Sequence, residues 1–219
     1  MIIKIRILTC ILTLFILLLS SCSKAPVKVA CVGNSITYGS GIENRVEDSY
    51  PAQLQELLGT KYDVWNFGYS GRTLLKKGDF PYWDEVHLKA VKAINPDIVI
   101  IKLGTNDTKP QNWEYADEFE TDYKKLIEEF SNLPSHPDIW LCYPVPAFAT
   151  RWGIRDSVIV HAIIPILDNI SSELNLPLID LYHPFLGKGA LFPDDIHPDK
   201  DGAGIMAEII AGMIMDEKQ

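Results

Sequence analysis

The feature that most constrains the fold is an apolar run at residues 97–103, Asp-Ile-Val-Ile-Ile-Lys-Leu. Four consecutive β-branched residues favour a strand, because branched side chains pack well on a pleated surface. Only Lys102 interrupts the run. A strand that is apolar on both faces must be covered on both faces, which is typical of a parallel sheet flanked by helices. The run therefore predicts a buried strand of an α/β domain.

Segments typical of strands and of helices alternate along the rest of the chain. Strands are expected at residues 27–32, 62–67, 97–103, 139–143 and 178–181. Apolar residues recur with helical spacing at residues 50–58, 84–94, 114–130, 156–174 and 203–215, with Pro165 expected to kink its helix. This alternation predicts a three-layer α/β/α sandwich with a five-stranded parallel sheet. In such a sheet, ligands bind at the carboxyl ends of the strands.

The first residues are expected to form a targeting signal. Lys4 and Arg6 give a positive start, residues 7–19 form an apolar run, and Leu-Ser-Ser-Cys follows at residues 19–22. The run is shorter than the about 20 residues that span a bilayer, so a transmembrane anchor is the less favoured alternative. The last four residues resemble the lipobox of bacterial lipoproteins, which implies cleavage before Cys22 and lipidation of its thiol.

We therefore expect three parts: a signal peptide at residues 1–21, a lipidated tether at 22–26, and one folded domain at 27–219. The protein would be an exported bacterial lipoprotein, anchored to a membrane through its N-terminal lipid and facing the periplasm or the cell surface. The net charge of −9 at pH 7 argues against nucleic acid as a partner of the folded domain. The sequence does not indicate the oligomeric state.

Two further cysteines, Cys31 and Cys142, fall within predicted strands. We place them on the first and fourth strands, with the third strand between them, so the two are separated by roughly 9–10 Å. That separation is too large for a disulfide, and we expect two buried thiols. No cofactor and no metal site are expected, because the remaining histidines lack the spacing of metal ligands: His87, His136, His161 and His183.

Four segments with chemically useful residues follow predicted strands. One of them is a glycine turn at residues 66–71 after the second strand, where glycine lets a backbone N–H approach a ligand closely. A serine on the turn after the first strand, Ser35, would be exposed for attack as a nucleophile. Asn106, after the third strand, could donate to a developing oxyanion. Asp194 precedes His197 by three residues, so its carboxylate could orient the imidazole and leave the other ring nitrogen free as a base. Each segment alone is more typical of an ordinary turn or helix cap, so the prediction depends on their combination.

In this order, the four segments resemble the SGNH (GDSL-type) hydrolases, a family named for its Ser, Gly, Asn and His. The resemblance extends from the first strand to the last helix and implies a flavodoxin-like topology. It implies that Ser35 is the nucleophile, His197 the general base and Asp194 its orienting acid. It also implies an oxyanion hole formed by the N–H groups of Ser35 and Gly68 and the side-chain amide of Asn106. Many members have Gly-Asp-Ser where this chain has Gly-Asn-Ser.

Residues 66–73, Asn-Phe-Gly-Tyr-Ser-Gly-Arg-Thr, are similar to members that act as carbohydrate O-acetylesterases, including sialate O-acetylesterases. The resemblance implies a serine esterase that removes O-acyl, most simply O-acetyl, groups from carbohydrates. Four side chains after strand ends are candidates for substrate contact, or else for loop packing: Arg72, Trp113, Arg151 and Trp152. Two alternatives stay open, a lipid-directed thioesterase or lysophospholipase of the same family, and a non-catalytic glycan-binding lipoprotein.

Overall fold

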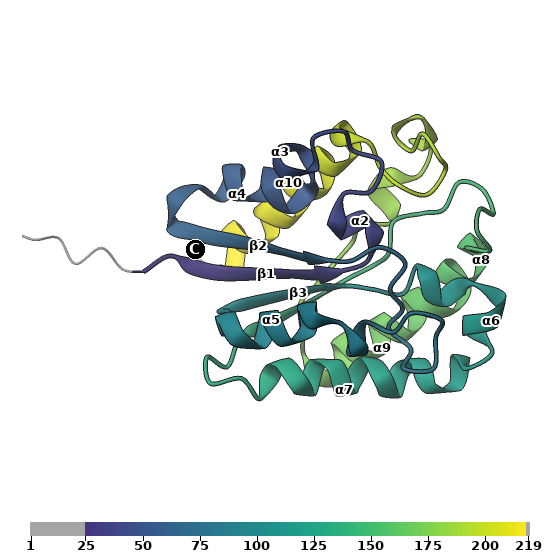
Figure 1. Cartoon of the computed structure of the whole chain (residues 1–219), viewed down its shortest axis with the longest axis horizontal. Helices are drawn as coiled ribbons and strands as arrows, with labels where there is room; N and C mark the ends of the chain where they lie inside the picture. Colours follow the sequence, from purple (N-terminus) through teal and green to yellow (C-terminus); the bar gives the residue numbers. More distant parts are fainter. Residues whose placement is uncertain (1–24, 218–219) are drawn as a thin grey trace, which may run out of the picture.

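The computed structural model describes residues 25–217. The predictions made for residues 1–24, including the signal peptide and lipidation of Cys22, lie outside the described residues. A parallel sheet with the strand order β2-β1-β3-β4-β5 runs through the centre of the molecule (Figure 1). Its strands are β1 (Val27–Gly33), β2 (Tyr62–Gly68), β3 (Ile98–Lys102), β4 (Asp138–Cys142) and β5 (Leu178–Ile179). The predicted five-stranded parallel sheet is therefore confirmed.

Helices cover both faces of the sheet because its central strands are apolar on both sides. One face is covered by α4 (Tyr50–Leu58) and α10 (Lys200–Glu217) (Figure 1). The other face is covered by α5 (Val86–Ile94), α7 (Phe119–Ser131) and α9 (Ile164–Leu174). Successive residues of β1 face opposite sides, so Val32 packs with α7 and Cys31 packs with α4. The three-layer α/β/α sandwich is confirmed.

The helix expected at residues 156–174 is continuous but irregular. It begins with α8 (Asp156–Val158), widens into a π-helical turn at Ile159–Ile163, and continues as α9. Pro165 lies at the start of α9, where its missing N–H is tolerated after the widened turn. By length and composition this helix could cross a membrane. However, Leu167 and Ile170 are fully buried in the core, as expected of an amphipathic helix packed on a sheet.

Several short helical elements were not predicted from apolar periodicity. Among them are α2 (Ser35–Tyr38), α3 (Arg45–Asp48), α6 (Pro110–Trp113) and a 3₁₀ turn at Ala116–Glu118 that precedes α7. As a result, the helix predicted at residues 114–130 begins at Phe119. Segments of three or four residues are too short for an apolar stripe to mark them.

Cys31 and Cys142 are free and buried, on β1 and β4, with β3 between them. The expectation of two separate buried thiols is therefore confirmed. Burial raises the pKa of Cys142 to about 12, so this thiol is unreactive at neutral pH.

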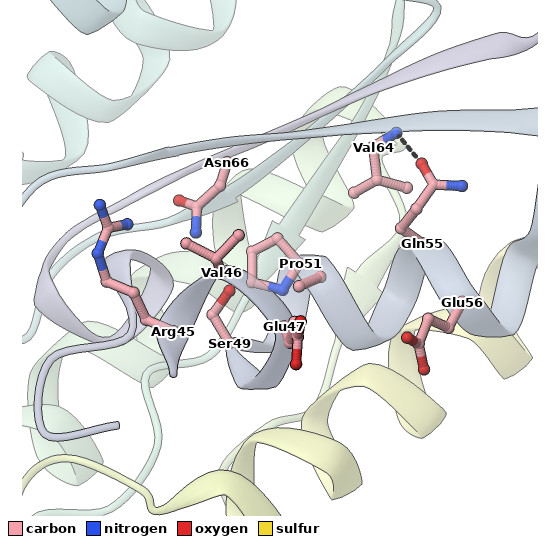
Figure 2. A pocket seen from close by; sticks show the side chains of 10 residues that line it. Arg45, Val46, Glu47, Ser49, Pro51, Gln55, Glu56, Val64 and Asn66 are labelled. Atoms are coloured by element: carbon pink, nitrogen blue, oxygen red, sulfur yellow. Dashed lines mark hydrogen bonds between the residues drawn. The ribbon is translucent and has the colours of Figure 1, made fainter. Parts of the chain in front are cut away.

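The exposed edge of the sheet at β2 is covered by a side chain of α4. Gln55 accepts a hydrogen bond from the Val64 N–H at 2.7 Å (Figure 2). It also donates to the Tyr62 carbonyl at 3.1 Å. These bonds replace those of a neighbouring strand, which protects the edge from pairing with another chain. A pocket of about 440 Å³ lies here between α3, α4 and β2. None of the predicted site residues lines it.

Candidate active site

Ser35 lies at the sharp turn between β1 and α2. An added Cβ at Gly33 would lie 2.1 Å from Thr37 Oγ1, so the close approach of strand and helix requires glycine there. Asn34 is the N-cap of α2, and its Oδ1 accepts a hydrogen bond from the Ile36 N–H at 3.1 Å. Asn34 therefore has the capping role that was the alternative reading for Ser35. Ser35 stays at the first helical position with 9% of its surface exposed.

His197 connects Ser35 to Asp194. Its Nε2 lies 2.8 Å from Ser35 Oγ, and its Nδ1 lies 2.7 Å from Asp194 Oδ2. The other oxygen, Asp194 Oδ1, accepts from the backbone N–H groups of Ile196 at 3.0 Å and His197 at 2.7 Å. Since the carboxylate is fixed by this turn, the imidazole is held with one nitrogen toward the acid and the other toward the serine.

The Asp194 carboxylate is the charged member of this chain of hydrogen bonds. Partial burial acts to raise its pKa, but hydrogen bonds from the backbone and ring of His197 and from the Ile196 N–H outweigh burial and lower the pKa. Asp194 is therefore ionised at neutral pH. An ionised carboxylate beside Nδ1 stabilises the imidazolium that forms when His197 accepts a proton.

Asn106 reaches the same place from a 3₁₀ turn after β3. It is 4% exposed, and its Nδ2 donates to the Arg72 carbonyl at 3.1 Å. Asn112 Nδ2 donates in turn to the Asn106 carbonyl at 2.8 Å, which fixes the backbone. A side-chain amide carries two N–H groups, so one remains to donate to a ligand.

These side chains surround a cavity of about 200 Å³ at the carboxyl edge of the sheet. It is lined by Ser35, Ser40, Ser70, Gly71, Asn106, Lys109, Trp152, Ile154 and His197. The structure therefore brings together the predicted Ser35, Asn106 and His197, although they are far apart in the sequence. Lys109 and Gly71 were not among the predicted site residues.

The prediction of Gly68 as an oxyanion donor disagrees with the geometry. Its N–H already donates to Asn66 Oδ1 at 2.9 Å, and an added Cβ would lie 2.2 Å from the Tyr38 nitrogen. Gly68 thus serves the close packing of β2 against α2. Gly71 lines the cavity instead, with a φ of 82° that favours glycine. The second glycine of the Gly-Tyr-Ser-Gly segment was the signal that could have identified it.

Of the four predicted substrate contacts, Trp152 lines the cavity. Arg72 does not, because its Nε donates to Glu85 at 2.6 Å and its guanidinium lies over the Tyr69 ring. Trp113 packs against the core on the face of the sheet that α5, α7 and α9 cover, where its ring contacts Phe119. Arg151 precedes Trp152 in the chain, and its Nε donates to Asp195 Oδ2 at 2.9 Å. Arg72 and Trp113 therefore do not line the cavity.

Within residues 25–217, no group of three or more His, Cys, Asp or Glu side chains is arranged to hold a metal ion. A second Asp-x-x-His turn follows β5, with His183 Nδ1 at 2.8 Å from Asp180 Oδ2. It repeats the local geometry of Asp194 and His197 but lies outside the cavity that Ser35 lines. The Asp-x-x-His motif alone therefore does not define a site. The site is defined by the Ser35 hydroxyl, which lies within hydrogen-bond distance of His197.

A serine bonded to a histidine that is bonded to an aspartate is the arrangement found in serine hydrolases as a class. Residues 31–205 match the GDSL-like Lipase/Acylhydrolase family. The chain belongs to this family, which confirms the predicted SGNH (GDSL-type) resemblance and places the chain among the carboxylic ester hydrolases.

A curated relative is an acetylxylan esterase of Xylanibacter ruminicola, 46% identical over 206 residues, which cover 86% of this chain and 43% of that protein. The chain thus spans less than half the length of this relative. A carbohydrate acetylesterase from Sinorhizobium meliloti has a similar structure, with a TM-score of 0.68 at 18% identity, covering 87% of this chain and 99% of the other. The aryl esterase of M. smegmatis has a TM-score of 0.66 at 16% identity, with the same coverage of 87% and 99%. These structures share the fold.

Proposed function

We propose that the protein is a serine esterase in which Ser35 is the nucleophile, His197 the general base and Asp194 its orienting acid. The observation that carries this proposal is the continuous chain of hydrogen bonds of 2.7 and 2.8 Å from Asp194 through His197 to Ser35. A serine hydroxyl is a weak nucleophile at neutral pH and needs such a base.

In the acylation step, Ser35 Oγ attacks the carbonyl carbon of the ester while its proton moves to His197 Nε2. The resulting tetrahedral intermediate collapses, the carbon–oxygen bond to the alcohol breaks, and His197 returns the proton to the leaving oxygen. Water then attacks the acyl-Ser35 with His197 again as base, which releases the carboxylic acid and restores the serine.

The negative oxygen of the intermediate needs donors that are already in place. Support comes from Asn106 Nδ2 and the backbone N–H groups of Ser35 and Gly71, all of which belong to residues lining the cavity. Gly71 replaces Gly68 in this proposal. Backbone donors at a helix start and a left-handed turn cost no reorganisation during the reaction.

We propose O-acetyl groups on carbohydrates as the substrate. The acetylxylan esterase relative supports this choice. So do the polar residues of the cavity, among them Ser40, Ser70 and Lys109, and its modest volume of about 200 Å³. A lipid-directed enzyme would need a long apolar groove beside Ser35.

The test is kcat/KM for p-nitrophenyl esters from C2 to C12, together with acetate release from acetylated xylan. We expect the rate to fall beyond C2 and acetate to be released from the polymer. Each buried methylene would contribute about 0.8 kcal/mol in an apolar groove, so a maximum at C8 or longer favours the thioesterase or lysophospholipase alternative. If no ester is hydrolysed, the non-catalytic glycan-binding alternative replaces the proposal.

We also propose that the enzyme is an exported lipoprotein anchored through Cys22. The support is the sequence pattern, with Lys4 and Arg6 before an apolar run that ends in Leu-Ser-Ser-Cys. Val27, the first residue of β1, lies at the amino ends of the parallel strands (Figure 1), whereas the cavity lies at their carboxyl ends. Cys22→Ser should move the protein out of the membrane fraction, whereas mass spectrometry showing an unmodified Cys22 in the native protein would contradict the proposal.

A further inference from the structure

Trp152 is an exposed aromatic side chain held in a strained backbone conformation. Its φ is 50°, in the left-handed region that bulky residues rarely adopt, and 60% of its surface is exposed. A hydrogen bond of 2.8 Å from the Ile154 N–H to the Arg151 carbonyl closes the turn around it. The indole ring centre lies 5.6 Å from that of His197. Strain of this kind collects at ligand sites, where the surrounding structure maintains it.

Lys109 lies beside Trp152 on the wall of the same cavity. An added Cβ at Gly153 would lie 3.7 Å from Lys109 Cγ, so the lysine stem runs along the Trp152–Gly153 turn. The side chain is 13% exposed, and its ammonium is 3.6 Å from Asp79 Oδ2, beyond hydrogen-bond distance. It makes no hydrogen bond to the part of the chain that the structure describes. The N–H donors of Lys109 are therefore available to a ligand, while Asp79 balances the charge.

We propose that Trp152 and Lys109 form the subsite for the sugar ring that carries the ester, an inference that rests on the proposed function. A pyranose ring has an apolar face of C–H groups and a rim of hydroxyl groups. The exposed indole suits the apolar face, and the ammonium donates to a hydroxyl oxygen at the rim. Because Asp79 already neutralises Lys109, the subsite takes a neutral sugar.

The experiment compares two acetyl esters that use the same nucleophile, acetylated xylo-oligosaccharide and ethyl acetate, which has neither ring nor hydroxyl groups. The quantity measured is the ratio of their kcat/KM values in wild type, Lys109→Met, Trp152→Ala and Trp152→Phe. The ratio does not depend on the amount of folded protein, since both esters are tested on one preparation. We expect Lys109→Met and Trp152→Ala to lower the ratio at least about tenfold. Trp152→Phe should lower the ratio less than Trp152→Ala does, because an aromatic ring remains for the sugar to contact.

Matched controls are Lys77→Met and Trp65→Ala. Lys77 is an exposed lysine paired with Glu118, and Trp65 is 43% exposed on β2; neither lines the cavity. Both controls should leave the ratio unchanged. If Lys109→Met and Trp152→Ala lower both rates equally, the subsite is wrong although the esterase proposal stands. If wild type hydrolyses neither ester, the proposed function fails and the subsite with it.

Discussion

Replacement of Lys102 tests how much a buried charge without a hydrogen-bond partner destabilises this fold. Lys102 lies at the end of β3, is 1% exposed, and its Nζ has no hydrogen-bond partner within the described residues. Burial lowers its pKa from 10.5 to about 8. At 1.36 kcal/mol for each pKa unit, holding the charged form in the fold costs about 3 kcal/mol. Lys102→Met keeps an unbranched side chain only one atom shorter and removes the charge, so the free energy of unfolding of the variant should be about 3 kcal/mol higher than that of wild type at pH 7.

The sign of the pH dependence follows from the lowered pKa. Between pH 8 and 10.5 the unfolded chain still binds a proton at Lys102 that the folded chain has lost, so wild type gains stability as pH rises through this range. The variant lacks this gain, and its advantage should shrink. Urea denaturation of both proteins at pH 7 and pH 10 measures the difference, in which the titration of other groups largely cancels. A variant that is less stable at pH 7, or a difference that is independent of pH, would refute the reasoning.

Three further predictions concern the site and its supports. Asn106→Ala should lower kcat by roughly 10²–10³ with little change in KM, as expected for one oxyanion donor; an unchanged kcat would remove it from the oxyanion hole. Asp194→Asn should lower kcat by about 10⁴, because an amide favours the wrong tautomer of His197; a small loss in steady-state rate would argue against its orienting role. Asp107 is fully buried, and burial, opposed by hydrogen bonds from backbone N–H groups, raises its pKa to about 6. Its stabilising contribution is complete below about pH 4 and is lost as pH rises through 6, so melting curves of Asp107→Asn should show a smaller loss over that range than wild type.

The layers of this fold can be predicted because burial on both faces of the central strands leaves a strong apolar pattern, whereas the strand order was implied by the family resemblance. The run at residues 98–101 is apolar throughout, and it becomes the fully buried centre of β3. Short elements escape prediction because tertiary contacts define them. The π-helical turn before Pro165 and the helix at Ser35 depend on what packs against them, which no local periodicity records.

The site could be predicted where residue type and strand end together specify a role. Ser35, Asn106 and His197 each follow a strand or precede a helix, and the topology brings them to one edge. The choice between Gly68 and Gly71 depends on which N–H is occupied by Asn66 Oδ1, and residue type alone does not show this.

Which side chains line the cavity also could not be predicted from the sequence. Arg72 and Lys109 are both cations in loops after strands, but Glu85 binds Arg72 closely while Asp79 stays 3.6 Å from Lys109. Sequence position does not distinguish these two cases, since Glu85 is 13 residues from Arg72 and Asp79 lies in a different loop from Lys109.

The central claim is that Ser35 is the nucleophile, and its most direct test is the turnover of acetyl esters by Ser35→Ala. Removing a triad serine costs on the order of 10⁶ in kcat in a comparable hydrolase, so activity should fall to background. The melting temperature should stay close to that of wild type, because Ser35 caps nothing and Asn34 retains its bond to Ile36. A folded Ser35→Ala protein that retains a substantial fraction of wild-type kcat would contradict the account.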